Sequence, residues 1–153
     1  MLWCPRPSMP IPFWKSKSLR SMTRDEWESL CDGCGKCCLH KIEDDDGKVH
    51  LTVVACRLLD PATARCRDYE NRKSLVPGCV RITPRNVRKL ALPHSCAYRT
   101  LAEGRELPRW HPLVTGDPGS TRNAGRAVGP WVLSEEDVPE DELEEYVVAS
   151  IDE

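Results

Sequence analysis

Four cysteines lie within eight residues of one another, in the order Cys-x-x-Cys-x-x-Cys-Cys. These four residues are Cys31, Cys34, Cys37 and Cys38. A Cys-x-x-Cys step can direct two sulfurs toward one metal centre, and a second step adds a third sulfur. The intervening Gly33 and Gly35 allow the positive φ that so tight a turn requires. The spacing therefore indicates a metal-binding loop.

A second group of cysteines follows as single residues: Cys56, Cys66, Cys79 and Cys96. Together the two groups supply eight thiols, which is a natural number for two four-thiolate sites. The spacing does not show how the eight would be divided. Thiolates select zinc, iron–sulfur clusters or Cu(I) over hard cations. The ninth cysteine, Cys4, stands apart in a Pro-rich start and leaves an odd count for any complete pairing.

Zinc and iron–sulfur predict different arrangements of these cysteines. Structural zinc sites usually pair two Cys-x-x-Cys turns, whereas this chain has one triple and several single cysteines. A Cys-x-x-Cys-x-x-Cys run with a distant fourth cysteine is typical of ferredoxins, although the Pro that follows their cysteine is missing here. We therefore favour an iron–sulfur cluster slightly over Zn2+. Free thiols without metal are disfavoured, because crowded thiolates repel one another or oxidise.

The 153 residues suffice for one domain, and the 13 prolines predict a loop-rich body. We expect a small α+β single domain, stapled by metal, with short helices and a β-hairpin. Residues 1–11 are interpreted as a disordered arm or a mis-assigned start, with Met9 as a candidate first residue. Residues 12–133 form the expected cysteine-cluster domain, and residues 134–153 an acidic C-terminal segment with a short helix. Phe13 and Trp14 are candidates to anchor the arm on the body.

Local sequence signals predict the helices and strands that surround the cysteines. Thr23 and Glu26 form a capping box that opens a helix running into Cys31. Asp-Gly at 46–47 predicts a hairpin between residues 39–43 and 48–54. Further helices are predicted over 84–92, 96–103 and 139–149, and a strand over 128–133. Ser95 would cap the second of these helices, so that the helix dipole lowers the pKa of Cys96.

Other chemistry is weakly indicated. The chain holds no phosphate-binding glycine loop and no nucleophile elbow, and no catalytic residue is assigned. The aspartates at 44–46 are interpreted as an exposed turn rather than a calcium site. His40 and His50 are expected on the strand surface rather than as metal ligands. His111 is interpreted as a hydrogen-bonded structural histidine rather than a ligand or a catalyst.

The charges are segregated along the chain, although the net charge is only −2. From Arg57 to Arg126 there are fourteen Lys and Arg against six Asp and Glu, while Ser134 to Glu145 hold eight acids and no base. We interpret this as a solvated surface with an acidic tail, so nucleic acid is not favoured as a partner and a protein partner stays open. No stretch approaches the ~20 apolar residues of a membrane span, and no signal peptide is visible. We expect a cytoplasmic protein, where clustered cysteines are more often metal ligands than disulfides.

The chain resembles the YcgN-like bacterial cysteine-cluster family, whose CxxCxxCC domain is described as zinc- or iron-chelating. The resemblance begins at Pro12-Phe-Trp-Lys15, runs through the Cys31–Cys38 loop and Ala55-Cys56-Arg-Leu-Leu-Asp60, and ends beyond Leu107-Pro-x-Trp-His-Pro-Leu113. It implies that the metal ligands are the eight cysteines at 31, 34, 37, 38, 56, 66, 79 and 96. It implies no particular reaction.

Two alternatives to a plain metal-binding role stay open. The first is an iron–sulfur enzyme that carries out redox chemistry or methyl transfer, the latter by similarity of the cysteine cluster to flagellin lysine methylase. The second is a zinc-structured protein-interaction module that uses the basic middle or the acidic tail. An enzyme would require an open coordination position or a cosubstrate pocket, and the sequence indicates neither.

Overall fold

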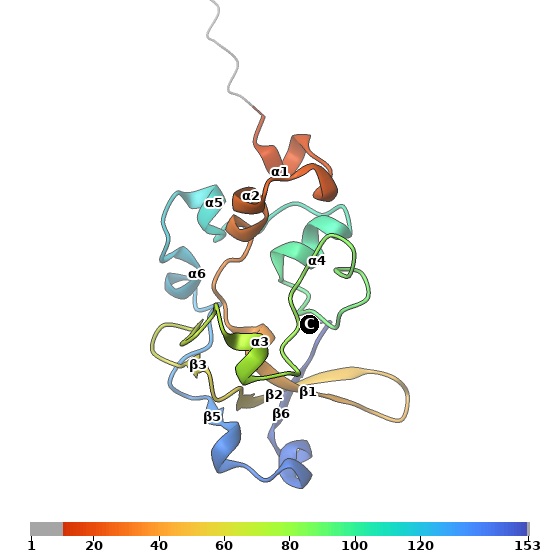
Figure 1. Cartoon of the computed structure of the whole chain (residues 1–153), viewed down its shortest axis with the longest axis vertical. Helices are drawn as coiled ribbons and strands as arrows, with labels where there is room; N and C mark the ends of the chain where they lie inside the picture. The colour runs from red at the N-terminus through yellow and green to blue at the C-terminus, as the bar shows by residue number, and fades with distance from the viewer. Residues whose placement is uncertain (1–10, 153) are drawn as a thin grey trace, which may run out of the picture.

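A four-stranded sheet lies in the lower half of the molecule and a group of short helices lies in the upper half (Figure 1). The structure is a computed structural model that describes residues 11–152. The predicted α+β class is confirmed, and its elements are all short. The expectation for the N-terminal arm, Cys4 included, falls on residues outside the described range, apart from Ile11.

The helices are α1 (Phe13–Ser16), α2 (Arg24–Ser29), α3 (Arg72–Leu75), α4 (Ala97–Ala102), α5 (Pro112–Thr115) and α6 (Ser120–Asn123). The 3-10 turns are η1 (Leu19–Ser21), η2 (Lys36–Cys38), η3 (Glu135–Asp137) and η4 (Glu140–Tyr146). The strands are β1 (Leu39–Glu43), β2 (Val49–Ala55), β3 (Leu59–Asp60), β4 (Arg65–Cys66), β5 (Leu133–Ser134) and β6 (Val147–Ser150).

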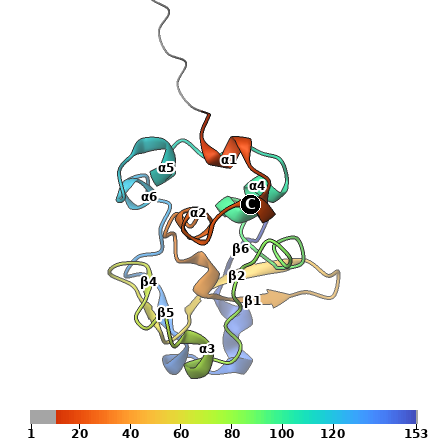
Figure 2. The ribbon, with the colours of Figure 1, turned by 45° about the horizontal axis from the view of Figure 1, so that its top comes forward.

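Strand β2 is the centre of the larger sheet. It pairs with β1 as the predicted hairpin, and its other edge pairs antiparallel with β6 and parallel with β5. β3 and β4 form a separate two-stranded ribbon, in which Leu59 pairs with Cys66. The hairpin projects to one side of the molecule in both ribbon views (Figures 1 and 2).

Two hydrophobic cores correspond to the two halves. The sheet core consists of Leu39, Leu51, Ala55, Leu59, Ala64, Val128, Val132 and Ile151. The helical core consists of Trp27, Leu30, Val87, Leu92, Ala97 and Tyr98. Phe13 and Trp14 pack against the helical core, as predicted for the anchor of the arm. Cys38 packs against the sheet core, whereas Cys96 packs against the helical core.

Several predicted elements need correction. Residues 84–92 form a series of turns and no helix, because the Asn86 side chain accepts from the Thr83 N–H and donates to the Arg81 carbonyl. The last predicted helix is a 3-10 turn followed by β6, since Val147 and Val148 are β-branched and complete the edge of β2. The strand expected over 128–133 is reduced to β5.

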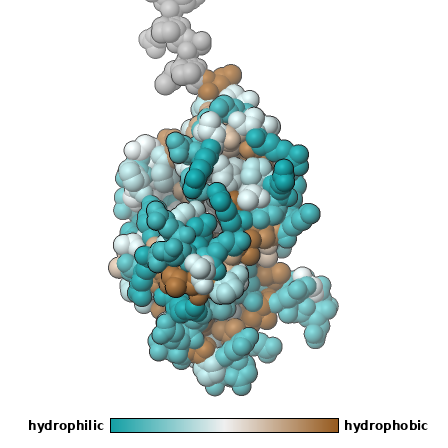
Figure 3. All heavy atoms as spheres, in the orientation of Figure 1, coloured by the Kyte–Doolittle hydropathy of each residue, from teal (hydrophilic) through white to brown (hydrophobic). Residues whose placement is uncertain are grey.

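Polar surface covers most of the face shown in Figure 3, and apolar atoms reach the surface mainly in the lower half. The exposed apolar residues near or on β5 and β6 are Trp131, Leu133, Val147 and Val148. No helix within residues 11–152 is both long enough and apolar enough to cross a membrane.

Candidate metal centre

The Cys31–Cys38 segment connects the two halves, because it leaves α2 in the helical half and enters β1 in the sheet (Figure 1). Helix α2 is held by the predicted capping box, in which the Thr23 hydroxyl accepts from the Glu26 N–H and the Glu26 carboxylate accepts from the Thr23 N–H. Cys31 follows two residues after the helix ends. The first candidate ligand is therefore fixed to a capped helix.

The two glycines of the loop are required in different ways. Gly33 and Gly35 have φ of +75° and +74°, as predicted for the tight turn. A Cβ at Gly35 would lie 2.7 Å from the Val128 side chain and 3.0 Å from the Ala64 carbonyl oxygen, both in the sheet core. The Val128 N–H also donates to the Cys34 carbonyl at 2.8 Å. The loop is thereby pressed against the sheet core.

Asp32 is a buried carboxylate inside the loop, and the sequence analysis did not single it out. Its Oδ1 accepts a hydrogen bond from the Cys34 N–H at 3.1 Å, which folds the Cys-x-x-Cys step into an Asx turn. Its negative charge contributes to raising the pKa values of Cys31, Cys34 and Cys96. An aspartate directly after the first cysteine was the signal that could have predicted this turn.

Cys96 approaches the loop through the contact between α2 and α4. The Trp27 and Tyr98 rings pack with centroids 4.6 Å apart, and the Tyr98 hydroxyl donates to the Trp27 carbonyl at 2.8 Å. Cys96 is the N-cap residue of α4, which corrects the prediction that Ser95 caps this helix. The end of α2 and the start of α4 therefore bring Cys31 and Cys96 to the same region.

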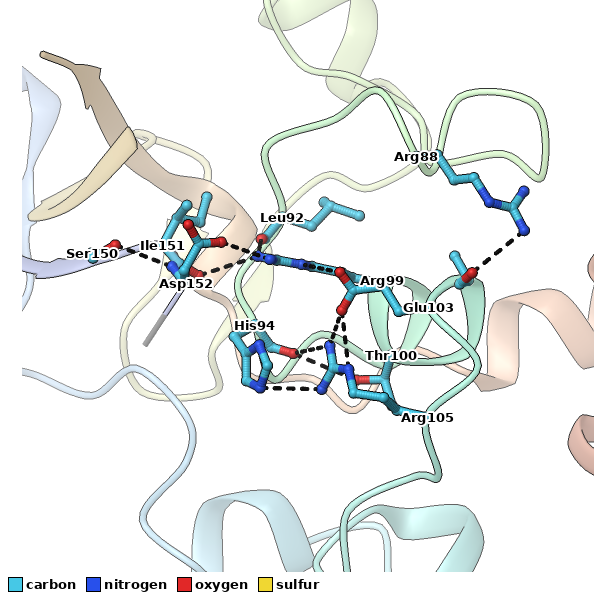
Figure 4. A network of polar contacts seen from close by, with 11 residues as sticks. Arg88, Leu92, His94, Arg99, Thr100, Glu103, Arg105, Ser150, Ile151 and Asp152 are labelled. Atoms are coloured by element: carbon cyan, nitrogen blue, oxygen red, sulfur yellow. Dashed lines mark hydrogen bonds and ion pairs between the residues drawn. The ribbon is translucent and has the colours of Figure 1, made fainter. Parts of the chain in front are cut away.

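Arg99 fastens α4 to the C-terminal segment, as Figure 4 shows. Its guanidinium donates to the Leu92 carbonyl at 2.8 Å and to the Asp152 carboxylate at 2.6 Å, and it also binds Glu103. The His94 N–H donates to the Ile151 carbonyl at 2.9 Å. These bonds fix the chain on both sides of Cys96.

Cys31, Cys34 and Cys37 of the loop and Cys96 at the start of α4 are called the first set, and their charges act on one another's pKa values. Burial is the main cause that raises the pKa of Cys34 and raises the pKa of Cys96 to about 11. The expected lowering of the Cys96 pKa by the helix is therefore wrong, because burial outweighs the backbone hydrogen bonds to its sulfur. Cys31 and Cys37 are exposed, so the set is accessible from solution.

The other four cysteines, Cys38, Cys56, Cys66 and Cys79, are called the second set. The Cys56 N–H donates to the Cys38 carbonyl at 2.8 Å, and Cys66 pairs with Leu59 in the small ribbon. Burial raises the pKa of Cys56, and the charges of Glu135, Cys66 and Cys79 add to the rise. The pKa of Cys38 is raised by its hydrogen bond to Cys37 and by burial, with further contributions from Cys56 and Cys66.

Cys37 and Cys38 join the two sets. They lie in the 3-10 turn η2, so their side chains do not alternate between opposite sides as they would in an extended segment. A hydrogen bond from Cys38 lowers the pKa of Cys37, and the nearby Lys41 ammonium lowers it further. Lys41 Nζ donates to the Leu39 carbonyl at 3.2 Å, which keeps the cation beside the pair.

The donor groups fit a soft metal. Each set consists of thiols, which prefer zinc or iron–sulfur clusters to hard cations. Within residues 11–152, no three His, Cys, Asp or Glu side chains converge tightly enough to hold an ion as they stand. Thiols with raised pKa values keep their protons near neutral pH, so binding of a metal would draw the sulfurs together and release protons.

The four histidines belong to neither set. His40 lies 3.3 Å from Glu135 and His50 lies 2.8 Å from Asp44, so both have strand-surface partners as predicted. His111 is fully buried and lies 2.7 Å from the Leu30 carbonyl, which confirms its structural role. His94 contacts Arg105 (Figure 4). Asp44 also accepts two backbone bonds of its own turn, as expected for a hairpin turn.

A surface pocket of about 490 Å³, which was not expected from the sequence, is lined by charged and tyrosine side chains and by none of the eight cysteines. Its lining includes Glu28, Tyr69 and Arg72, and the Arg72 guanidinium lies 3.7 Å from the centre of the Tyr69 ring. The Tyr69 hydroxyl donates to Glu28 at 2.9 Å. Burial raises the pKa of Tyr69, and the hydrogen bond to Glu28 and the charge of Cys31 raise it further.

Comparison with known proteins gives one consistent result. Residues 30–97 match the CxxCxxCC family described as "Putative zinc- or iron-chelating domain". A UPF0260 protein of Rhizorhabdus wittichii is 56% identical over 139 residues, which cover 90% of this chain and 94% of that protein. UPF0260 proteins of Rhodopseudomonas palustris and Azotobacter vinelandii are 50% and 52% identical, over 94% and 90% of this chain and 89% and 93% of theirs. No solved structure matches this chain.

Proposed function

The chain belongs to the UPF0260 family, and we propose that it is a metal-binding protein whose ligands are its eight clustered cysteines. These ligands are Cys31, Cys34, Cys37, Cys38, Cys56, Cys66, Cys79 and Cys96. The observation that carries the proposal is that the Cys31–Cys38 loop joins the two halves of the molecule, with Cys38 packed against the sheet core and Cys96 against the helical core. Clustered thiols that bind no metal are prone to oxidation.

Iron in a cluster is the metal form that we favour over zinc. Cys31, Cys34 and Cys37 come from one loop, and the contact between Trp27 and Tyr98 brings the start of α4, with Cys96, toward that loop. A run of three cysteines with a fourth that is distant in sequence is the ligand arrangement of a ferredoxin-type iron–sulfur cluster. Backbone N–H groups of the loop donate to its sulfurs, from Gly33 to Cys31 and from Lys36 to Cys34. Hydrogen bonds of this kind tune the reduction potential of a cluster. Zinc in four-thiolate sites is the alternative, since it accepts the same donors.

The test is anaerobic purification of the full chain, followed by metal and sulfide analysis and a visible spectrum. Brown protein that contains iron and inorganic sulfide would support the cluster. Colourless protein with about two zinc ions would indicate two structural zinc sites instead of a cluster, and the proposed metal-binding role would stand. Full-length, reduced protein that binds neither iron nor zinc, even after reconstitution, would refute the proposal.

A further inference from the structure

We infer that the eight cysteines form two separate four-thiolate centres, and that the boundary between the centres falls between Cys37 and Cys38. The first centre would take the first set, and the second centre would take the second set. The inference rests on the proposed function, because it requires that the thiols bind metal. It adds the division of ligands, which the cysteine spacing leaves open.

The backbone around the sheet core brings the second set together. Cys56 and Cys38 are joined by a 2.8 Å backbone hydrogen bond, and the Leu59 N–H donates to the Cys56 carbonyl at 2.9 Å. Leu59 then pairs with Cys66 across the β3–β4 ribbon. Three cysteines thus lie along one continuous hydrogen-bonded path that contains no member of the first set.

Cys79 reaches the same region through Arg57. The Arg57 guanidinium donates to the Leu75 carbonyl at the end of α3, at 2.5 Å, and to the Glu135 carboxylate at 3.3 Å. Cys79 follows α3 by one turn, in which its N–H donates to the Val76 carbonyl at 2.9 Å. Arg57, which follows Cys56 in sequence, therefore holds the segment that carries Cys79.

The helical core brings the first set together by a different route. The Trp27–Tyr98 contact places the end of α2 beside the start of α4, and hence Cys31 beside Cys96. Cys34 is fixed by the Asp32 turn and by the bond from the Val128 N–H to its carbonyl. Helix α3, which precedes Cys79, carries no member of the first set.

The adjacent pair faces different surroundings. Their sulfurs share a hydrogen bond, but their other neighbours differ: Cys38 packs on the sheet core, whereas Cys37 is exposed and its carbonyl accepts a hydrogen bond from Lys41. In two-cluster ferredoxins, too, a cysteine that follows a Cys-x-x-Cys-x-x-Cys run binds the other cluster. The chemistry and the packing therefore agree on the same boundary.

The test uses two matched variants of the full chain, Cys96→Ser and Cys79→Ser, each of which removes the last ligand of one set. After anaerobic purification, free thiols are alkylated, and peptide mass spectrometry identifies the protected cysteines. In Cys96→Ser we expect Cys37 to be alkylated and Cys38 protected, and in Cys79→Ser the reverse. Each variant should retain about half of the wild-type metal. Alkylation of Cys37 and Cys38 together in either variant would overturn the division.

A measurement on the wild-type chain covers the case in which a variant does not fold. The metal-free chain is reconstituted anaerobically with half of its saturating metal and then alkylated. We expect molecules with four protected thiols, divided along the two sets. At half loading some molecules carry both centres and some carry neither, so the partly protected molecules are the diagnostic ones. Protection of any other four thiols in these molecules would refute two separate centres. A wild-type chain that binds no metal would instead refute the proposed function itself.

Discussion

Replacing Gly35 by alanine should destabilise the protein far more than the same change at Gly33. Both glycines lie in the same loop with nearly the same positive φ, +74° and +75°. An alanine at either position therefore incurs the same left-handed backbone penalty, about 1 kcal/mol. The pair is a matched comparison in which only the surroundings of the new methyl group differ.

The surroundings predict the difference. At Gly35 the Cβ would lie 2.7 Å from Val128 Cγ2 and 3.2 Å from Ala64 Cβ, and both neighbours are buried in the sheet core. Ala64 already has φ of 58°, so it has little freedom to retreat. At Gly33 the Cβ would meet only the flexible end of Arg65, at 3.5 Å. Overpacking of this kind adds about 1–3 kcal/mol at Gly35 alone.

The assay is anaerobic thermal unfolding of both variants and the wild type, followed by circular dichroism. For a chain of this length each kcal/mol shifts the midpoint by about 2–4 °C, so Gly35→Ala should melt roughly 2–12 °C below Gly33→Ala. Metal content must be measured in the same samples, since loss of a bound metal lowers the midpoint as well. Equal midpoints at equal metal content would refute the steric argument.

Three further predictions concern the metal, the C-terminal fastening and acid stability. Anaerobic removal of all metal should lower the thermal midpoint, because a structural zinc contributes on the order of 10–16 kcal/mol of apparent folding energy in small domains; an unchanged midpoint would exclude a structural role. Arg99→Met should cost about 1 kcal/mol in chemical unfolding through loss of its bond to the Leu92 carbonyl, whereas Arg88→Met, which loses one 3.4 Å contact, should change little. The hydrogen bond from His50 holds the pKa of Asp44 below its ordinary value. Its stabilising contribution is present above the ordinary pKa of about 3.9 and disappears as the pH falls through the lowered value, so Asp44→Asn should flatten this acid limb of the midpoint-against-pH curve.

Local signals in the sequence were sufficient wherever a short segment determined its own conformation. The Thr23 capping box, the Asp-Gly hairpin turn and the two positive-φ glycines all appear as predicted. In each case the hydrogen bonds or dihedral angles involve residues only a few positions apart. Tertiary contacts did not override these local preferences.

The wrong predictions share a different cause. The segment 84–92 has a Pro start and a run of helix formers, but Asn86 binds backbone groups on its N-terminal side. Val147 and Val148 lie at the end of a helix-like acidic run, but the open edge of β2 recruits them as a strand. Propensity describes the isolated segment, and here a side-chain bond and a sheet edge outweigh it.

The Cys96 prediction failed for an electrostatic reason. Its place at the start of α4 was predicted to within one residue, and backbone N–H groups do donate to its sulfur. Burial nevertheless raises its pKa to about 11, because desolvation of a thiolate outweighs the field of a helix of six residues. Burial depends on the whole fold, so the sign of this shift was not accessible from the local sequence.

The proposed division of the cysteines could not be derived from the sequence, and the two cores explain why. Spacing along the chain groups Cys38 with Cys37, and their sulfurs share a hydrogen bond, whereas a backbone hydrogen bond joins Cys38 to Cys56 and its side chain packs on the sheet core. Each core is small and made of short elements, and such cores rarely suffice to stabilise a domain without additional cross-links. A metal at each set would fasten one core, and the peptide bond between Cys37 and Cys38 would join the two centres. Loss of the metal from one centre should therefore act on the other centre through this adjacent pair.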